Sequence, residues 1–426
     1  MSREMKDSGV EWIGEIPEEW KVVKLNKLCS IITGNTPDRG KQSCYYSNTD
    51  GVPWIKAENL GEGKSISHTA EYLTDEGCNV GRVFPPNTVY VCCIASVGKV
   101  GYSMVNASCN QQINALMFNN LYDWKYGYYV TLTQQEEYDI QASGNVMKII
   151  NSDKQKRLMC PLPHMDEQKK IVSFLDKQCA QIDYILEKTQ ASIGEYKTLR
   201  QAVITEAISK GVYEECGLRE SGVEWLGRIP KDWNIQKGKQ LFKETNERSV
   251  TGEEELLTVS HITGVTPRKN KNVNMFMSES LVDYKICHEG DVAANTMWMW
   301  QGAIGVSKYY GVISPSYNTY RQKADTYDAD YLEYLLRIPP LVATYAAYST
   351  GITASRLRLY PQGFFSILFP VPPRKEQQEI AVYLNKKIPQ IDRLIIKKEK
   401  FVDELKSYKR SLIYEYVTGK KEVPES

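Results

Sequence analysis

The chain has 426 residues, of which 42% are hydrophobic and 25% charged, with a formal net charge of +1. This composition is typical of a soluble protein of two or three domains and excludes a disordered chain. The near-zero net charge argues against a protein that binds nucleic acid through bulk positive charge alone. No apolar run approaches the ~20 residues of a membrane span, and the first residues lack a signal-peptide pattern, so we expect a cytoplasmic protein with reduced cysteines.

The first segment of the chain recurs in its second half. Ser8–Trp20 reads SGVEWIGEIPEEW and Ser221–Trp233 reads SGVEWLGRIPKDW, with an offset of 213 (225 − 12) between the first tryptophans. Solenoid units repeat every ~20 to 50 residues, so this longer period indicates two copies of a whole domain. We interpret the four tryptophans as packing or subunit-docking anchors, with a buried corner as the alternative: Trp12, Trp20, Trp225 and Trp233.

A block of short strand-like runs follows each tryptophan segment. Strands are predicted at Thr88–Ala95, Val52–Lys56, Glu255–Val259 and Gly311–Ser314, and aromatic helices at Asp123–Gln135 and Ala329–Leu336. The adjacent Cys92 and Cys93 are expected to be small buried residues of their strand. The sequence Ser96-Val97-Gly98-Lys99 lacks the G-x-x-x-x-G-K-[ST] pattern of a phosphate loop, so we interpret it as a tight turn between two strands.

A long helix is predicted after each block. Behind Pro163, apolar residues recur at seven-residue intervals between Asp166 and Lys210, at Leu175, Ile182, Tyr196 and Val203, with Thr189 in the gap. Behind Pro372-Pro373 the equivalent positions are Leu384, Ile391, Leu405 and Leu412, interrupted by Lys398. Such a helix would be ~65 Å long, and a heptad pattern of this length is typical of a coiled coil, so the partner we expect is the other copy.

The two blocks share a skeleton but are much less alike than the segments around them. Gly98-Lys99-Val100-Gly101 corresponds to Gly302-Ala303-Ile304-Gly305, and Asn114 to Asn318, at an offset of 204 (318 − 114). We infer one fold with two different surfaces, each of which binds something different.

The sequence contains no recognisable catalytic or metal site. None of its four histidines has metal-ligand spacing, and no C-x-x-C or G-x-G-x-x-G occurs. An Asn or Asp followed by Pro-Pro-aromatic, as in a methyl-donor pocket, is also absent. We therefore predict a binding protein with no catalytic residue, no metal and no cofactor of its own.

The framing motifs resemble those of the specificity subunit of type I restriction–modification enzymes. They are S-G-V-E-W-x-G-x-I-P-x-x-W, P-x-P-x-x-x-E-Q-x-x-I beginning at Pro161 and at Pro370, and an I-D dipeptide in each long helix. The motifs occur in the order typical of that family and twice over, which covers nearly the whole chain.

This resemblance implies an α+β fold with two similar mixed α/β target-recognition domains. Each is followed by a long helix, and the two helices pair as an antiparallel coiled coil with pseudo-twofold symmetry. The implied domains are 1–160 and 214–370 for recognition, with helices at 161–213 and 371–426. Each recognition domain would read one half of a bipartite DNA site. The framing regions would dock two methyltransferase subunits that carry S-adenosylmethionine, and a restriction subunit would join them for cleavage.

Side chains that read bases are expected to be Arg, Lys, Asn, Gln, Ser or Thr on loops. In the first block the candidates are Thr33, Asn35, Thr36, Lys56, Glu58, Asn59, Lys99, Asn110, Gln111, Gln112, Ser143, Asn145 and Lys148. In the second block they are Ser260, His261, Thr263, Arg268, Lys269, Asn270, Lys271, Trp298, Trp300, Gln301, Tyr317, Asn318, Thr350, Arg356 and Arg358.

Several of these candidates have a plainer interpretation. Asn110-Gln111-Gln112 is either a reading loop or a polar turn, and the cluster at Arg268 is either a phosphate clamp or a solvated loop. Trp298 and Trp300, at i and i+2 on a predicted strand face, are either core or interface, whereas Arg356 and Arg358 form the stronger pair. Two other functions stay open: a two-lobed scaffold that binds protein, and the recognition portion of a self-contained restriction or methylation enzyme.

Overall fold

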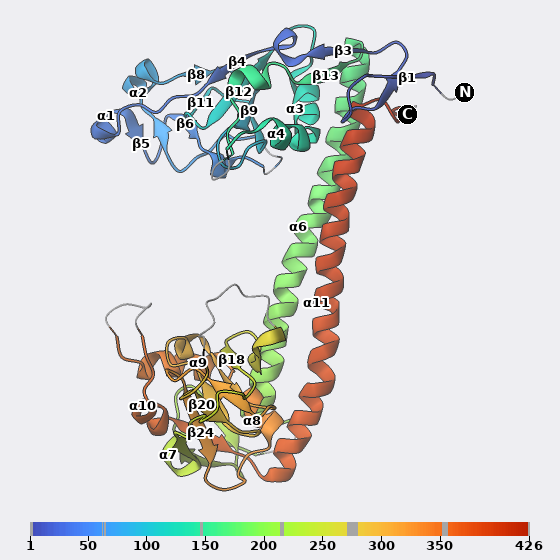
Figure 1. The fold of residues 1–426 in the computed structure, drawn as a ribbon. Helices are drawn as coiled ribbons and strands as arrows, with labels where there is room; N and C mark the ends of the chain where they lie inside the picture. The colour runs from blue at the N-terminus through green and yellow to red at the C-terminus, as the bar shows by residue number, and fades with distance from the viewer. Residues whose placement is uncertain are drawn as a thin grey trace. The chain divides into compact units, whose positions relative to one another are not determined.

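The chain folds into two compact units in the computed structural model (Figure 1). The structure describes residues 3–61, 63, 65–144, 148–213, 217–270, 280–351 and 357–424. Unit 1 comprises Met1–Thr189 and Phe401–Ser426, and unit 2 comprises Gln190–Lys400. Each unit therefore combines one block with half of each long helix. Among the described residues, no helix is both long and apolar enough to cross a membrane.

The first block is built on a four-stranded antiparallel sheet in the order β10-β9-β12-β4 and a five-stranded sheet in the order β5-β7-β6-β11-β8. Small sheets β1-β2 and β13-β3 frame it. The strands are β1 (Met5–Asp7), β2 (Glu15–Pro17), β3 (Lys21–Lys24), β4 (Cys29–Thr33), β5 (Tyr46–Ser47), β6 (Val52–Ile55), β7 (Tyr72–Leu73), β8 (Val83–Phe84), β9 (Thr88–Cys92), β10 (Val100–Ser103), β11 (Ala107–Cys109), β12 (Ile113–Phe118) and β13 (Met159–Leu162). The helices are η1 (Leu25–Lys27), η2 (Arg39–Lys41), α1 (Gln42–Tyr45), η3 (Ala57–Asn59), α2 (Asp75–Val80), α3 (Trp124–Thr133), α4 (Gln135–Gln141) and α5 (Ser152–Gln155).

The second block repeats the central sheet as β17-β24-β21-β22 and the frame as β14-β15 and β16-β25. It replaces the five-stranded sheet with two pairs, β18-β19 and β20-β23. The strands are β14 (Leu218–Glu220), β15 (Arg228–Pro230), β16 (Asn234–Lys237), β17 (Phe242–Thr245), β18 (Leu257–Ser260), β19 (Gly264–Pro267), β20 (Lys285–Cys287), β21 (Val292–Ala294), β22 (Ile304–Val306), β23 (Gly311–Ile313), β24 (Asn318–Gln322) and β25 (Leu368–Val371). The helices are α7 (Gly238–Leu241), η4 (Arg268–Asn270), η5 (Met299–Gln301), α8 (Ala329–Leu335), α9 (Pro339–Tyr348) and α10 (Pro361–Ser366).

The sequence-based predictions of these elements are largely confirmed. All four predicted strands and both aromatic helices are present, and Ser96–Lys99 forms the turn between β9 and β10. Strand β9 is buried over its whole length because Thr, Val and Tyr suit a pleated interior position. Cys92 and Cys93 are buried as predicted, and burial raises the pKa of the Cys93 thiol to about 12.

The two long helices are α6 (Met165–Lys210) and α11 (Arg374–Val417), each beginning just after its predicted proline. In unit 1 they pack antiparallel, since Phe174 contacts Tyr416 with ring centroids 4.5 Å apart while the later Asp183 pairs with the earlier Lys409. In unit 2 the same direction follows from the ion pairs Lys197–Glu399 and Arg200–Asp392. Both seams are apolar: Leu175, Ile182, Leu412, Ile204, Leu384 and Ile391 are all buried. The predicted antiparallel coiled coil is thus confirmed.

Each E-Q motif joins a long helix to its own block. The indole Nε1 of Trp20 donates to Glu167 Oε2 at 2.8 Å, and Trp233 donates to Glu376 at the same distance. Both indoles are almost fully buried, with exposed fractions of 0% and 1%. These two framing tryptophans are therefore buried packing residues, which fits both the predicted packing role and the predicted buried corner.

The glutamines of the two motifs hold backbone groups that would otherwise be unsatisfied. Gln377 accepts from Asp328 N at 2.8 Å and donates to the carbonyls of Thr326 and Pro372 at 3.0 and 2.9 Å. Gln168 makes the equivalent three bonds in unit 1. Asp328 caps α8, so the glutamine fixes the start of that helix against α11.

The end of the other long helix completes each unit. The Tyr126 hydroxyl donates to the Val417 carbonyl at 2.7 Å, and the Tyr331 hydroxyl donates to the Ile208 carbonyl at 3.4 Å. Gly419, with φ +73°, lies so close to Pro17 and Trp20 that a Cβ would approach within 3.0 Å of both. Positive φ and close approach both favour glycine here. Each block is therefore bound by two helices from different parts of the chain.

Candidate nucleic-acid interface

Three predicted loops of the first block meet at the ends of β4, β6 and β11. The Thr36 hydroxyl bonds Gln111 Oε1, and Asn35 N donates to Cys109 O at 3.0 Å. Asn110 N donates to Ile55 O at 3.1 Å, which ties the β11–β12 turn to the end of β6. The structure thus brings Thr36, Asn110 and Gln111 together, with Gln111 exposed.

Other candidates of these loops are engaged with the protein itself. Asn35 Nδ2 donates to Val80 O at 2.9 Å and its Oδ1 accepts from Arg82 N at 2.8 Å. The Thr33 hydroxyl donates to the buried Asn114 at 2.8 Å, so it points into the block. These bonds leave Thr33 and Asn35 as structural supports of the loop.

The turn after β6 carries a second group of candidates. Asn59 Oδ1 accepts from Lys56 N at 2.8 Å, which fixes the turn η3, and Lys99 Nζ donates to Ala57 O at 3.1 Å. Glu58 is exposed at the same turn, whereas Gln112, on the β11–β12 turn, is half-buried. Lys99 Nζ therefore binds the backbone of the turn that Lys56 begins, whereas Lys56 Nζ pairs with Glu71 at 2.5 Å.

The last candidates of the first block lie near α4. Ser143 Oγ accepts from Lys154 Nζ at 3.1 Å, and Lys148 Nζ bonds Asp139 at 2.6 Å. Asn145 lies outside the described residues. Both described side chains are exposed, so their protein partners leave them accessible.

In the second block the β18–β19 hairpin presents His261 and Thr263 at its exposed tip, next to Ser260. Arg337 of the segment after α8 holds this tip, because its Nη2 donates to the carbonyls of His261 and Ile262 at 2.8 and 2.6 Å. Its Nη1 bonds Glu333 at 2.9 Å. Burial raises the pKa of Glu333, while the charge of Arg337 opposes that rise.

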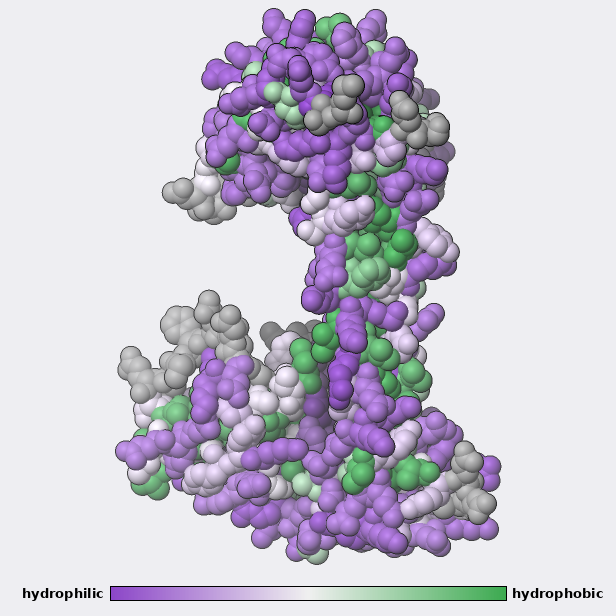
Figure 2. All heavy atoms as spheres, turned by 90° about the vertical axis from the view of Figure 1, so that its right-hand side faces the viewer, coloured by the Kyte–Doolittle hydropathy of each residue, from purple (hydrophilic) through white to green (hydrophobic). Residues whose placement is uncertain are grey.

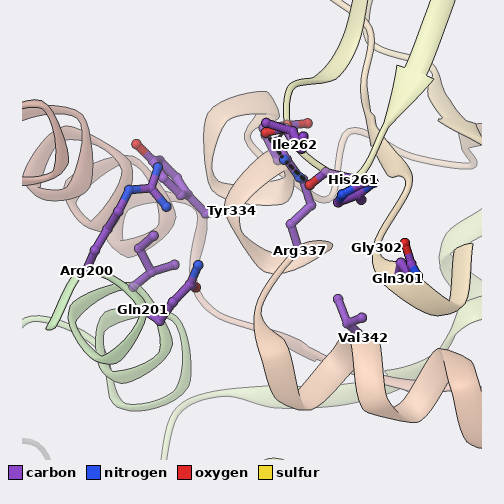
Figure 3. A pocket seen from close by; sticks show the side chains of 11 residues that line it. Arg200, Gln201, His261, Ile262, Gln301, Gly302, Tyr334, Arg337 and Val342 are labelled. Carbon is purple, nitrogen blue, oxygen red and sulfur yellow. Dashed lines mark hydrogen bonds and ion pairs between the residues drawn. The ribbon is translucent and has the colours of Figure 1, made fainter. Parts of the chain in front are cut away.

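A cavity of about 300 Å³ lies beside the hairpin tip (Figure 3). His261 and Gln301 line it together with Tyr334 and with Arg200 of α6. Arg200 is paired with Asp392 at 2.7 Å and Arg337 with Glu333, so neither arginine brings an unbalanced charge to the cavity. The cavity is therefore lined by two residues predicted to contact DNA, His261 and Gln301, but its two arginines are already paired and do not make it a strong anion site.

The Arg268 loop and the tryptophans form a further group. Lys269 pairs with Glu255 at 2.5 Å, and Asn270 is exposed beside it. The Tyr317 hydroxyl accepts from Asn295 at 2.8 Å; burial raises the pKa of Tyr317, and the positive charge of Arg268 opposes that rise. Arg268 and Tyr317 therefore lie close together. Lys271 lies outside the described residues.

The predicted strand at Trp298 and Trp300 is wrong. These residues lie at the 3-10 turn η5, which ends at Gly302 with φ +87°, and their rings stack with centroids 6.3 Å apart. Trp298 is 48% exposed, so it is not a core residue, whereas Trp300 Nε1 donates to Met297 O at 3.0 Å. A flat exposed indole of this kind provides a stacking surface.

Asn318 is corrected from a surface candidate to a core residue. It is 8% exposed, accepts from Lys285 Nζ at 3.2 Å and donates to the Tyr320 hydroxyl at 3.2 Å. Its counterpart Asn114 is equally interior and donates to Gln155 at 2.6 Å. Both asparagines satisfy buried polar groups behind the central sheet, which explains their shared position without DNA.

The remaining pair of the second block is only partly described. Thr350 and Arg358 exchange two backbone hydrogen bonds of 2.9 Å, so they form the base of a loop. Arg356 lies outside the described residues, and its role with Arg358 as a pair that contacts DNA stays a prediction.

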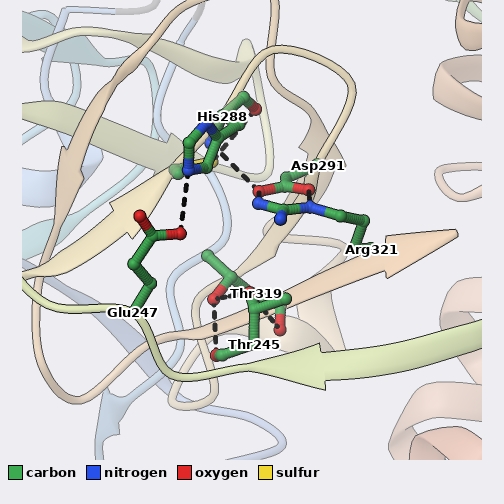
Figure 4. Close-up of polar contacts among 7 residues, drawn as sticks. Thr245, Glu247, His288, Asp291, Thr319 and Arg321 are labelled. Carbon is green, nitrogen blue, oxygen red and sulfur yellow. Dashed lines mark hydrogen bonds and ion pairs between the residues drawn. The ribbon is translucent and has the colours of Figure 1, made fainter.

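A polar network in the second block was not predicted from the sequence (Figure 4). Buried Asp291 accepts from Arg321 Nε and Nη2, both at 2.7 Å, and His288 Nε2 lies 2.9 Å from Glu247. The hydroxyls of Thr245 and Thr319 bond each other at 2.8 Å rather than the imidazole. The two threonine hydroxyls are therefore engaged with each other, and His288 is engaged with Glu247. No cluster suited to a metal ion occurs among the residues described.

Comparisons with known proteins agree with this architecture. Residues 17–194 match the family model described as the type I restriction modification DNA specificity domain. The HindI specificity subunit of Haemophilus influenzae is 29% identical over 172 residues, which are 38% of this chain and 37% of that protein. The putative MjaX specificity subunit of Methanocaldococcus jannaschii is 23% identical and aligns over 96% of this chain and 95% of that one.

The match is thus partial for some relatives and nearly complete for others: the chain spans about a third to a half of the HindI and MjaVIII subunits, 37% and 50%. A solved structure, from work on assembly and conformational transition of the type I R-M system, is 15% identical. It covers 94% of this chain and 98% of its own with a TM-score of 0.70, which shows a shared fold. The chain is thus similar in sequence to type I restriction-enzyme specificity subunits and shares its fold with a solved structure from a type I R-M system.

Proposed function

We propose that this chain is the non-catalytic specificity subunit of a type I restriction–modification complex in the cytoplasm. Each block reads one half of a bipartite DNA site, and the paired helices set the spacing between the halves. The observation that carries the proposal is the repeat of the frame around unlike surfaces. Both units share the Trp–Glu bond and the central sheet, whereas the five-stranded sheet of unit 1 is replaced by two two-stranded sheets in unit 2.

Exposed apolar residues on the helices support docking of two identical partners. Ile185 and Tyr408 of unit 1 correspond, at an offset of 209 (394 − 185), to Leu394 and Leu199 of unit 2. All four are exposed by 42% to 56%. Figure 2 shows apolar side chains on the surface of the long helices. Because the same feature occurs once in each unit, it suits two copies of one partner, the methyltransferase subunits, which would carry S-adenosylmethionine.

Side-chain chemistry in both blocks supports DNA as the ligand. In unit 1 Lys99 contacts the turn after β6 and Gln111 bonds Thr36 of another loop, and in unit 2 a basic loop lies beside Tyr317. Phosphate contacts and base contacts both draw on such residues. The chain's net charge of +1 is modest, so the methyltransferase partners would share the neutralisation of phosphates.

The test is methylation mapping with the reconstituted complex of this chain and its methyltransferase. We expect methylation at one split sequence, dependent on this chain, and DNA binding in gel shifts with the same dependence. The control replaces the first block by that of a relative, which should change one half-site only. Sequence-independent binding, or methylation at a continuous site, would refute the proposal. Methylation by this chain alone would instead indicate a self-contained enzyme.

A further inference from the structure

Arg39, which is not among the residues predicted from the sequence to contact DNA, is held rigidly at the surface of the first block. The Arg39 guanidinium lies over the rings of Tyr46 and Trp54, 4.2 and 4.5 Å from their centroids. The two rings are buried and meet edge to face at 5.2 Å. The Tyr46 hydroxyl donates to the Pro37 carbonyl at 2.7 Å, which fixes this ring under Arg39.

A carboxylate fixes the remaining freedom of the arginine. Arg39 Nη1 donates to Glu71 Oε1 at 2.7 Å and Nη2 donates to Oε2 at 3.2 Å. Lys56 Nζ lies 2.5 Å from the same carboxylate. Glu71 immediately precedes β7, and its carbonyl accepts from Trp54 N at 3.2 Å, so its backbone is held at the start of an inner strand of the five-stranded sheet. Two cations on one carboxylate leave a net positive charge.

The geometry leaves one edge of the guanidinium open. Glu71 occupies the end formed by Nη1 and Nη2, and among the described residues no hydrogen bond uses Arg39 Nε. The side chain is 41% exposed, compared with 15% for Glu71. Nε and the second hydrogen of Nη2 form a side-on pair of donors that matches two adjacent acceptors. Guanine presents such acceptors, O6 and N7, in the major groove.

We propose that Arg39 is a specificity-determining residue that reads a guanine in the half-site bound by unit 1, with Glu71 as its positioning residue. The inference rests on the proposed DNA-reading function. Lys56, already a candidate, belongs to the same cluster, and Thr36 and Gln111 lie on the preceding loop and the turn that it contacts. Ring stacking and the carboxylate fix the arginine beforehand, so less rotamer entropy is lost on binding a base.

The test is methylation by the reconstituted complex on a library with a randomised half-site. Arg39→Ala should lower the preference for G·C at one position of the unit 1 half-site by about 5- to 150-fold, the range of one bidentate base contact. Arg39→Lys should not restore it, because an ammonium lacks the paired donors. Glu71→Gln should weaken the preference at the same position by a smaller factor.

Two outcomes would overturn the inference. A loss that is uniform over all sequences and rescued by Arg39→Lys would make Arg39 a phosphate contact. An unchanged sequence profile with a lowered melting temperature would make the cluster a purely structural bridge. In both cases the wild-type complex would still methylate a bipartite site. If the wild-type complex showed no bipartite site, the proposed function itself would be refuted.

A matched control exists in the frame of the same unit. Arg3 lies over Trp20 at 5.3 Å and pairs with Glu167 at 2.6 Å, so its chemistry resembles that of Arg39. Arg3→Lys should leave the sequence profile unchanged, because this arginine lies on the frame rather than on the block.

Discussion

Asp183 accepts two hydrogen bonds from Lys409 Nζ, at 2.6 and 2.7 Å, and this pair recurs in unit 2 as Asp392 with Arg200 at 2.7 Å. The members of each pair differ in number by 209 from their counterparts (392 − 183). The isoleucines before the two aspartates, Ile182 and Ile391, are buried in the seam. The I-D dipeptide therefore combines an apolar contact with a charge that selects its partner on the other helix.

Exchange of this ion pair should reveal its contribution to the helix register. Asp183→Lys and Lys409→Asp should each lower the stability of unit 1, and the double exchange should recover about 0.5–1 kcal/mol, since the side chain of Lys409 is only 21% exposed. Hydrogen exchange of the amides in each unit measures this. The exposed pair Lys197–Glu399 is the control, with a coupling of less than about 0.5 kcal/mol. Equal couplings would contradict the argument.

Replacement of a motif glutamine should destabilise one unit selectively. Gln377→Leu leaves Asp328 N and two carbonyls without their partners, at a cost of roughly 2–5 kcal/mol. The start of α8 should then exchange its amide hydrogens faster, while unit 1 is unaffected. Gln168→Leu is the matched variant, with the reverse result. Loss of protection in both units from either variant would show that they do not unfold separately.

The periodic spacing of apolar residues predicted the helices and strands, because these elements form from contiguous sequence. The heptad spacing of Leu175 and Ile182 predicted α6, because an amphipathic stripe is a property of contiguous sequence. Strand β9 was likewise predicted from a contiguous run of Thr, Val and Tyr. The E-Q motif was recognised because it occurs twice in the sequence. The bonds of Gln377 to Thr326 and Asp328 could not be predicted, because they join residues about 50 positions apart.

The candidate interface was predicted less well, for a different reason. The residue type alone does not show whether an asparagine such as Asn318 is buried and hydrogen-bonded or exposed. Nor does it show whether an arginine such as Arg39 is stacked on aromatic rings or free in a loop. The partners of Arg39 come from three separate segments, at Tyr46, Trp54 and Glu71. Only the fold brings these together, so no local pattern marks Arg39 as a fixed donor.

Acid should weaken the Arg39 cluster within a defined range of pH. Arg39 first and Lys56 second lower the pKa of Glu71 from 4.5 to about 2. Because the folded pKa lies below the unfolded one, the stabilisation is present above about pH 4.5 and is lost as the pH falls toward 2. Glu71→Gln should flatten this part of the melting-temperature profile of unit 1. Parallel profiles for variant and wild type would show that Glu71 is not linked to folding.

The repeated apolar positions on the helices should control the number of bound partners. Ile185→Asp with Tyr408→Asp should remove one methyltransferase subunit, and Leu199→Asp with Leu394→Asp the other, because each pair places charge in a docking surface that must lose water. Native mass spectrometry counts the subunits. Val250→Asp, at a position that is 86% exposed and not repeated, is the control. Retention of two subunits by both double variants would place the docking surface elsewhere.

Lengthening the paired helices should change the spacing between the half-sites. One extra heptad in each helix, after Thr189 and before Phe401, keeps the apolar seam in register and adds about 10 Å at 1.5 Å per residue. DNA rises about 3.4 Å per base pair, so the preferred gap should grow by about three base pairs. Methylation mapping on targets with varied gaps measures this, with a seven-residue insertion at the exposed Gly252 turn as the control. If the preferred gap stays the same, the helices are not the ruler, and the spacing must come from the docked partner subunits.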